Sequence, residues 1–162
     1  MLNILTYGAP ELSQKAESVK YINGDIPVLV EQMFDAMHAG KGIGLAAPQV
    51  GSLIRLFVCH AADEEPMVFI NPEILETSLE EISYEEGCLS LPGLYGDIIR
   101  PRLITVQAVG LGGKPFTLRA DGIMSRVIHH EMDHLDGILF PDRLPPNRKE
   151  RLFSIYEKKL RI

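Results

Sequence analysis

Apolar residues recur three or four positions apart near the start of the chain, the spacing of one helix face. This stripe lies within residues 25–42 and consists of Ile26, Leu29, Val30, Met33, Phe34 and Met37. Asp25 is a suitable N-cap, Pro27 fits the first turn, and Gly40 is a suitable end. The pattern therefore predicts an amphipathic helix between Asp25 and Gly40.

Short apolar runs rich in β-branched residues dominate the middle of the chain and predict strands. These runs cover residues 54–59, 66–75 and 102–110, and residues 112–120 are typical of the return strand of a hairpin. The stretch GIGLAAPQVGS, residues 42–52, carries three glycines and a proline. Such punctuation predicts a loop.

Two more helices are predicted in the last third of the chain. The pattern becomes helical from about Asp121 to Asp136, and Gly137 suits the position after the last turn. Residues 147–162 form a second amphipathic stretch. Helices placed early and late around a strand-rich middle favour an α+β fold. We expect one domain over residues 1–162, with short antiparallel or mixed sheets packed around the 121–136 helix.

Composition and charge narrow the classes of function. The chain has 162 residues, of which 46% are hydrophobic and 23% charged, as in ordinary globular proteins. Its apolar runs fall far short of the roughly 20 residues that cross a membrane. The N-terminal segment lacks the features of a signal peptide, so a cytoplasmic location is expected. The net charge of −6 argues against DNA binding.

The last segment differs in charge from the rest of the chain. Residues 145–162 carry six lysines and arginines and two glutamates, a net charge of +4, whereas the remainder carries −10. One interpretation is a solvated terminal helix whose cations suit its C-terminal dipole. The other is a surface that docks on ribosomal RNA.

The stretch RVIHHEMDHLDG, residues 126–137, carries the strongest chemical signal. His130, Glu131 and His134 spell H-E-x-x-H, and residues four apart lie on one face of a helix. Two imidazoles placed in this way can bind one metal ion, with the glutamate as general base. The apolar flanks predict a buried helix, where these groups would be costly without a metal. His129 lies roughly 100° around the helix from His130 and is expected to be structural.

The third ligand decides the class of metal site. Catalytic sites of this type keep three protein ligands and one open position. The extended metalloprotease motif would need a histidine at Phe140, and the downstream carboxylates Glu150 and Glu157 lie too close to the chain end. Cys88, in the turn-like stretch EEGCLSLPG, is the better candidate. Cys59 lies in an apolar run and suits a buried position with a free thiol.

Three motifs taken together resemble the signature of the peptide deformylase family. They are GIGLAAPQVG at 42–51, EGCLSLPG at 86–93 and HEMDHLDG at 130–137. The resemblance implies that Cys88, His130 and His134 bind one divalent metal ion. It also implies that Glu131 is the catalytic acid and base. Bacterial members of this family work with Fe(II), so Fe(II) is expected here, with Zn(II) or Ni(II) able to replace it.

The implied reaction is removal of the N-formyl group from the first methionine of nascent proteins, with release of formate. A water activated by the metal would attack the formyl carbonyl, and Glu131 would move its proton to the leaving amine. Gln49 and the backbone N–H of Leu89 would stabilise the oxyanion. The expected walls of the methionine pocket are Gly42, Ile43, Gly44 and Val127. The N-formylmethionyl peptide would add a strand beside one of the first two motifs.

Rival functions depend on the same residues. An H-E-x-x-H endopeptidase that cleaves internal peptide bonds remains the alternative, although Phe140 counts against its commonest form. The stretch GIGLAA also fits a relaxed dinucleotide fingerprint, but a helix rather than a strand precedes it. A structural metal site would need a fourth ligand, and a ribosome-binding module would leave the motif residues without a role. Glu86 could contact a ligand, Arg100 or Arg102, and the sequence leaves this choice open.

Overall fold

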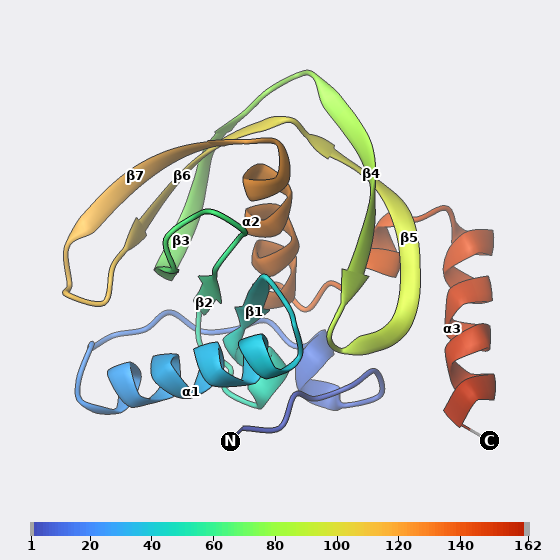
Figure 1. The fold of residues 1–162 in the computed structure, drawn as a ribbon, viewed down its shortest axis with the longest axis horizontal. Coiled ribbons are helices and arrows are strands. Elements are labelled where there is room, and N and C mark those ends of the chain that lie inside the picture. The colour runs from blue at the N-terminus through green and yellow to red at the C-terminus, as the bar shows by residue number, and fades with distance from the viewer. Residues whose placement is uncertain (1, 161–162) are drawn as a thin grey trace.

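A computed structural model describes residues 2–160 as strands and helices in two antiparallel sheets around a central helix (Figure 1). The basic residue Arg161 and its neighbour Ile162, which end the predicted terminal helix, lie outside the described residues. In chain order the elements are η1 (Pro10–Ser13), α1 (Asp25–Ala39), β1 (Gly44–Ala46), η2 (Ala47–Val50), β2 (Leu56–Cys59), β3 (Met67–Thr77), β4 (Glu81–Cys88), β5 (Leu91–Pro101), β6 (Leu103–Val109), β7 (Pro115–Asp121), α2 (Gly122–Leu135), η3 (Phe140–Arg143) and α3 (Pro146–Leu160). The α+β fold class is confirmed.

The larger sheet has five strands in the order β1-β2-β3-β6-β7. Helix α2 covers it, and the buried α2 residues Ile128 and Leu135 pack against Phe57 of β2 and Phe69 of β3. The two phenylalanine rings stack with their centroids 4.6 Å apart. Helix α1 packs on the β1–β2 end of the sheet through its predicted apolar stripe. The sequence pattern thus identified the faces that form the core.

The second sheet is a long ribbon made of β4 and β5 alone, which lies on the other side of α2 (Figure 1). A third apolar cluster joins β5 to η3, α3 and the N-terminal segment. Within this cluster the ring of Phe153 in α3 stacks on Tyr7, with centroids 4.3 Å apart. Helix α2 is therefore held between two sheets that come from different parts of the chain.

The ends of helices α1 and α2 agree with the prediction to within a residue, and α3 begins one residue earlier than predicted. Helix α1 begins at Asp25 itself, with Gly24 at the N-cap, so the predicted cap is displaced by one position, whereas Gly40 is the C-cap as expected. Gly137 adopts φ 74°, and a Cβ there would lie 2.7 Å from the backbone of Ser13. Only glycine suits both requirements. No helix in residues 2–160 combines the length and apolar character needed to cross a bilayer.

Two segments differ from the sequence prediction. Residues 42–52, expected as a loop, contain the three-residue strand β1 and the turn η2. Residues 81–101, for which no strand was predicted, form β4 and β5. Cys88 is the last residue of β4 and precedes a two-residue turn, so it does lie beside a turn, but at the end of a strand. Most of β4 is exposed, and it lacks the apolar alternation that marks a half-buried strand.

Candidate metal centre

The thiol of Cys88 and the imidazoles of His130 and His134 lie together between β4 and α2. One possible ligand atom from each of the three residues lies within 4.8 Å of the others, and no further His, Cys, Asp or Glu of residues 2–160 joins this group. The Sγ atom of Cys88 is 3.3 Å from Nε2 of His134. The two histidine rings, one helical turn apart, have centroids 5.0 Å apart. The three residues proposed from the sequence are thus brought together.

Helix α2 presents the histidines because its opposite side is anchored in the core. Ile128 and Leu135 are fully buried against the five-stranded sheet, which turns the histidines toward the ribbon. The ring nitrogen Nδ1 of His130 is 2.9 Å from Oε1 of Glu86 on β4. A hydrogen bond at Nδ1 leaves Nε2 of His130 free to bind a metal. This contact answers the question that the sequence left open about Glu86.

Glu131 is almost completely buried, with 3% of its surface exposed, beside the three possible ligands. Its Oε1 atom has no hydrogen-bond partner among the described residues. Burial raises the pKa of this carboxyl to about 7, against the lowering effect of His130. A buried carboxyl of this kind can hold or release a proton near neutral pH.

Gly44 of β1 makes room for the carboxylate of Glu131. A Cβ at this position would lie 2.5 Å from Oε2 of Glu131 and 3.1 Å from a methyl group of Val127. Any larger residue would therefore displace the glutamate. Gly42 is restricted in the same way, because a Cβ there would lie 2.7 Å from the side chain of Leu89.

Gln49 lies in η2 with both ends of its amide engaged. Its Oε1 accepts a hydrogen bond of 2.9 Å from the backbone N–H of Ala46. Its Nε2 donates to Oγ of Ser90 at 3.0 Å and lies 3.6 Å from Sγ of Cys88. The carbonyl end is fixed by the backbone, so the amide directs its N–H groups toward the turn that follows Cys88.

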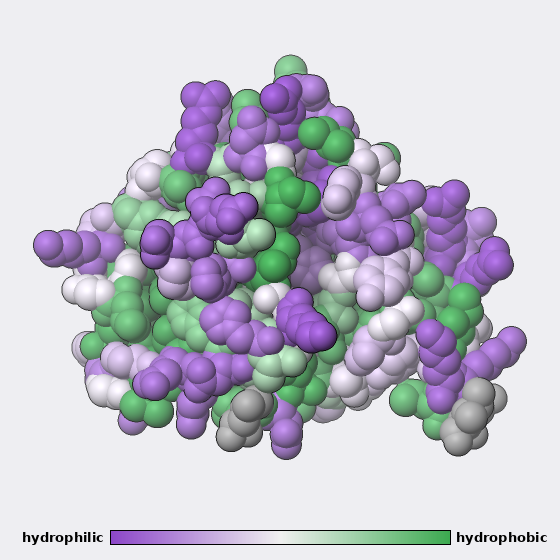
Figure 2. Space-filling model, in the orientation of Figure 1, coloured by the Kyte–Doolittle hydropathy of each residue, from purple (hydrophilic) through white to green (hydrophobic). Residues whose placement is uncertain are grey.

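A cavity of about 660 Å³ opens beside these groups. Its lining includes all four residues expected to form the substrate pocket, and also Gln49, Leu89 and Glu131. The remaining lining contains Tyr84, Tyr95, Ile123 and Arg126. The surface is hollowed near the centre of the face shown in Figure 2. The catalytic and pocket residues proposed from the sequence thus share one cavity.

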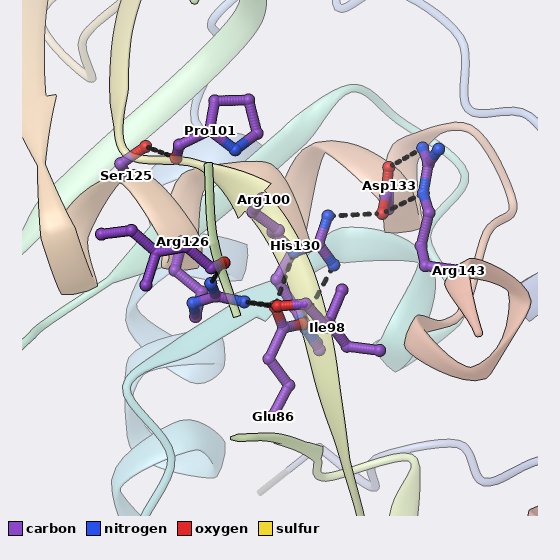
Figure 3. A network of polar contacts seen from close by, with 10 residues as sticks. Glu86, Ile98, Arg100, Pro101, Ser125, Arg126, His130, Asp133 and Arg143 are labelled. Carbon is purple, nitrogen blue, oxygen red and sulfur yellow. Dashed lines mark hydrogen bonds and ion pairs between the residues drawn. The ribbon is translucent and has the colours of Figure 1, made fainter. Parts of the chain in front are cut away.

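Glu86 is the centre of a buried charged network behind the cavity (Figure 3). Its carboxylate accepts hydrogen bonds of 2.6 Å and 3.0 Å from Arg100 and one of 2.6 Å from Arg126. Burial alone would raise the pKa of Glu86, but the hydrogen bonds from His130 and Arg100 outweigh it and lower the pKa to about 2. Glu86 is therefore a carboxylate under all ordinary conditions.

Asp133 of α2 extends this network instead of contacting the three possible ligands. It accepts hydrogen bonds of 3.0 Å from Arg100 and 2.7 Å from Arg143 of η3. Neither this role of Asp133 nor the role of Arg126 was predicted from the sequence. Nothing local marks either residue, because their partners lie up to 44 positions away in the chain.

The two remaining residues singled out from the sequence, His129 and Cys59, lie apart from the group of three. His129 belongs to no group of possible ligands, and burial lowers its pKa to about 4, aided by the charge of Arg100. Cys59 is fully buried in the core, where burial raises the pKa of its thiol to about 12. Both placements agree with the structural roles expected for them.

The donor atoms fit a divalent transition-metal ion. One thiol and two imidazoles are ligands that several such ions accept, and three protein ligands leave a position for water or substrate. The unpartnered carboxylate oxygen of Glu131 points to the same conclusion, because a buried oxygen without a hydrogen bond is costly unless another group occupies the site.

Comparison with known proteins gives one consistent result. Residues 1–150 match the family model described as polypeptide deformylase. The chain is 42% identical over 163 residues to peptide deformylase of Acinetobacter baumannii, covering 99% of this chain and 93% of that protein. It is 45% identical over 149 residues to peptide deformylase of Treponema pallidum, covering 92% and 91% of the two chains.

Solved structures agree with the sequence relatives. Peptide deformylase from Ehrlichia chaffeensis in complex with actinonin superposes with a TM-score of 0.96 at 35% identity, covering 100% of this chain and 99% of that one. The protein from Thermus thermophilus gives a TM-score of 0.92 at 40% identity, covering 99% and 95% of the two chains. Sequence, fold and the assembled side chains agree, and the chain belongs to the polypeptide deformylase family.

Proposed function

We propose that this protein removes the N-formyl group from the N-terminal methionine of newly synthesised proteins and releases formate. The observation that carries the proposal is the group formed by Cys88, His130 and His134 beside one cavity, which Glu131 also lines. The family supports the same activity. An endopeptidase of the H-E-x-x-H type has no support from these comparisons.

Cys88, His130 and His134 would hold one divalent metal ion. When bound, the ion would lower the pKa of a water molecule and polarise the formyl carbonyl. Fe(II) is our proposal for the ion in the cell, with Zn(II) or Ni(II) as replacements in a purified preparation. The mixed thiolate and imidazole donor set is compatible with all three.

Glu131 would act as the general base and then as the general acid. Its carboxyl has a pKa of about 7, raised by burial, so it can take a proton from the attacking water and later give it up near neutral pH. The recipient would be the amine nitrogen of the departing methionine. Gly44 contributes by leaving space for this carboxylate.

Two N–H groups would stabilise the negative charge that develops on the formyl oxygen. One is Nε2 of Gln49, whose amide is held in place by the backbone of Ala46. The other is the backbone N–H of Leu89, in the turn after Cys88. A single donor of this kind typically contributes about 2.7–4 kcal/mol to transition-state stabilisation.

The cavity would bind the methionine side chain, and the rest of the peptide would bind through its backbone. Gly42, Ile43 and Val127 would form the apolar walls. Within residues 2–160, β1 lies at the edge of its sheet and β4 pairs with β5 alone, so both strands have a free edge. A peptide that adds to such an edge pairs through its backbone, which makes binding tolerant of the residues after methionine.

We also propose that α3 belongs to the same catalytic domain and contacts the ribosome from the cytoplasm. The stacking of Phe153 on Tyr7 supports the first part, because it fixes α3 to the N-terminal segment. The six cations of residues 145–162 support the second, because RNA phosphates attract such a surface. Co-sedimentation with ribosomes at increasing salt would test it.

The central experiment is a formate-release assay with formyl-Met-Ala-Ser and protein purified without oxygen. We expect formate and free Met-Ala-Ser, and no activity after removal of the metal. Failure to release formate from metal-loaded protein would contradict the proposal. Cleavage of internal peptide bonds in the same assay would instead favour the endopeptidase.

A further inference from the structure

The three residues proposed to hold the metal come from a strand and a helix, which share no backbone hydrogen-bond ladder. Cys88 ends β4, whereas His130 and His134 lie on α2. In the part of the chain that the structure describes, β4 is paired with β5 alone. The distance between thiol and imidazoles therefore depends on side chains that join α2 to the ribbon.

Arg126 makes the most direct of these connections (Figure 3). From the second turn of α2, its Nη1 donates to Oε2 of Glu86 at 2.6 Å and to the carbonyl of Ile98 at 2.8 Å. Its Nη2 donates to the carbonyl of Ile82 at 2.6 Å. The side chain of Arg126 thus forms hydrogen bonds with both strands of the ribbon, two with β4 and one with β5.

The side chain of Arg126 is buried, so water competes little for these hydrogen bonds. The residue is 8% exposed, and the ring of Tyr84 covers its guanidinium at 5.7 Å from the ring centroid. The carboxylate of Glu86 that Arg126 contacts is the same one that accepts from Nδ1 of His130. Arg126 therefore acts on both sides of the proposed metal centre, on the strand of Cys88 and on the orientation of His130.

We propose that Arg126 is a positioning residue for the metal centre, which clamps the β4–β5 ribbon to α2 and holds Glu86 against His130. The inference rests on the proposed function, because it takes Cys88, His130 and His134 as the ligands. It adds that metal retention depends on a residue whose hydrogen bonds go to Glu86, Ile98 and Ile82 and to none of the three ligands.

The planar guanidinium group of Arg126 is required for these three hydrogen bonds. Its two terminal nitrogens bond a carboxylate and two carbonyls at fixed angles, which a lysine ammonium on a flexible stem cannot reproduce. Arg100 shares Glu86 but otherwise donates to Asp133, so it does not replace the bonds to Ile82 and Ile98. Arg126→Met keeps most of the apolar stem and removes all three bonds.

The test measures metal retention rather than activity. Wild-type protein, Arg126→Met and Arg126→Lys are loaded with Ni(II), and the rate of metal loss to excess chelator is recorded. We expect Arg126→Met to lose the metal at least about tenfold faster than wild type, the usual effect of removing a group that orients a ligand. Arg126→Lys is expected to lose it at an intermediate rate.

A spectroscopic measurement reports on Cys88 itself. In the Co(II)-loaded protein, the thiolate-to-cobalt charge-transfer absorption depends on the sulfur–metal bond. We expect this absorption to weaken in Arg126→Met and to recover in part in Arg126→Lys. A general loss of stability that left the metal geometry intact would not change the absorption per bound ion.

Arg102→Met is the matched control. Arg102 also joins distant segments, through Glu80 at 3.1 Å and Asp121 at 3.2 Å, but it is exposed and contacts no part of the cavity. Wild-type rates of metal loss in both Arg126 variants, or equally fast loss in Arg102→Met, would overturn the inference. If Arg126→Met does not fold, Arg126→Lys decides alone. Wild-type protein that binds no metal would contradict the proposed function instead.

Discussion

Oε1 of Glu86 lies 2.9 Å from Nδ1 of His130, while the same carboxylate neutralises two buried arginines, Arg100 and Arg126. One acidic group thus serves both the orientation of a histidine and the compensation of buried charge. Neither function can be removed without affecting the other.

Glu86→Gln is expected to destabilise the metal-free protein by about 3–5 kcal/mol, because breaking a buried ion pair leaves an uncompensated charge. The measurement is the free energy of unfolding in urea of metal-free wild-type protein and metal-free Glu86→Gln. Glu80→Gln is the control, since it removes an exposed partner of Arg102 and should cost less than about 1 kcal/mol. Equal effects of the two substitutions would contradict the assigned role of Glu86.

Gly44→Ala is expected to lower kcat/KM by about 100-fold with little change in the melting temperature. The added methyl group would lie 2.5 Å from Oε2 of Glu131, so the carboxylate must move, and displacements near 1 Å cost about that factor. Gly112→Ala is the control, because a Cβ there meets nothing within 4 Å. Unchanged kinetics of Gly44→Ala would show that Glu131 tolerates displacement.

Glu131→Gln should separate catalysis from metal binding. The amide cannot accept and return a proton, so formate release should fall by about 100-fold or more. Metal content, measured by atomic absorption, should stay close to one ion per chain. His134→Ala is expected to lose both metal and activity. A glutamine variant without metal would mean that Glu131 is itself needed for binding.

Stability should decline in alkaline solution because of Cys59. Burial, reinforced by the negative charge of Glu131, raises the pKa of this thiol from 9.0 to about 12. The folded protein then holds the proton more tightly than the unfolded chain. The stabilisation is therefore complete below pH 9 and is lost as the pH rises toward 12.

The slope of unfolding free energy against pH checks this effect. Above pH 9, wild-type protein should lose up to about 1.4 kcal/mol per pH unit more than Cys59→Ala, whose side chain has no proton to release. Parallel slopes for the two proteins would rule out a contribution from the buried thiol. The difference in slope is the quantity of interest, because the alanine variant also changes core packing.

The sequence alone determined the local parts of this protein. Helix α1 and helix α2 were predicted from apolar spacing, and the spacing of His130 and His134 within α2 placed two imidazoles on one face. Gly137 marked the end of α2. These features could be predicted because the helical period spans only a few residues. The sequence pattern and the structure that it specifies therefore lie in the same short segment.

Only the tertiary structure decided what surrounds that helix. Strands β4 and β5 escaped prediction because a two-stranded ribbon exposes most of one strand and shows no apolar alternation. The bonds of Arg126 to Glu86 and Ile82, and the approach of Gln49 to Cys88, join residues about 40 positions apart. Such contacts depend on how the chain folds back on itself, and no pattern within one segment encodes the partner in another.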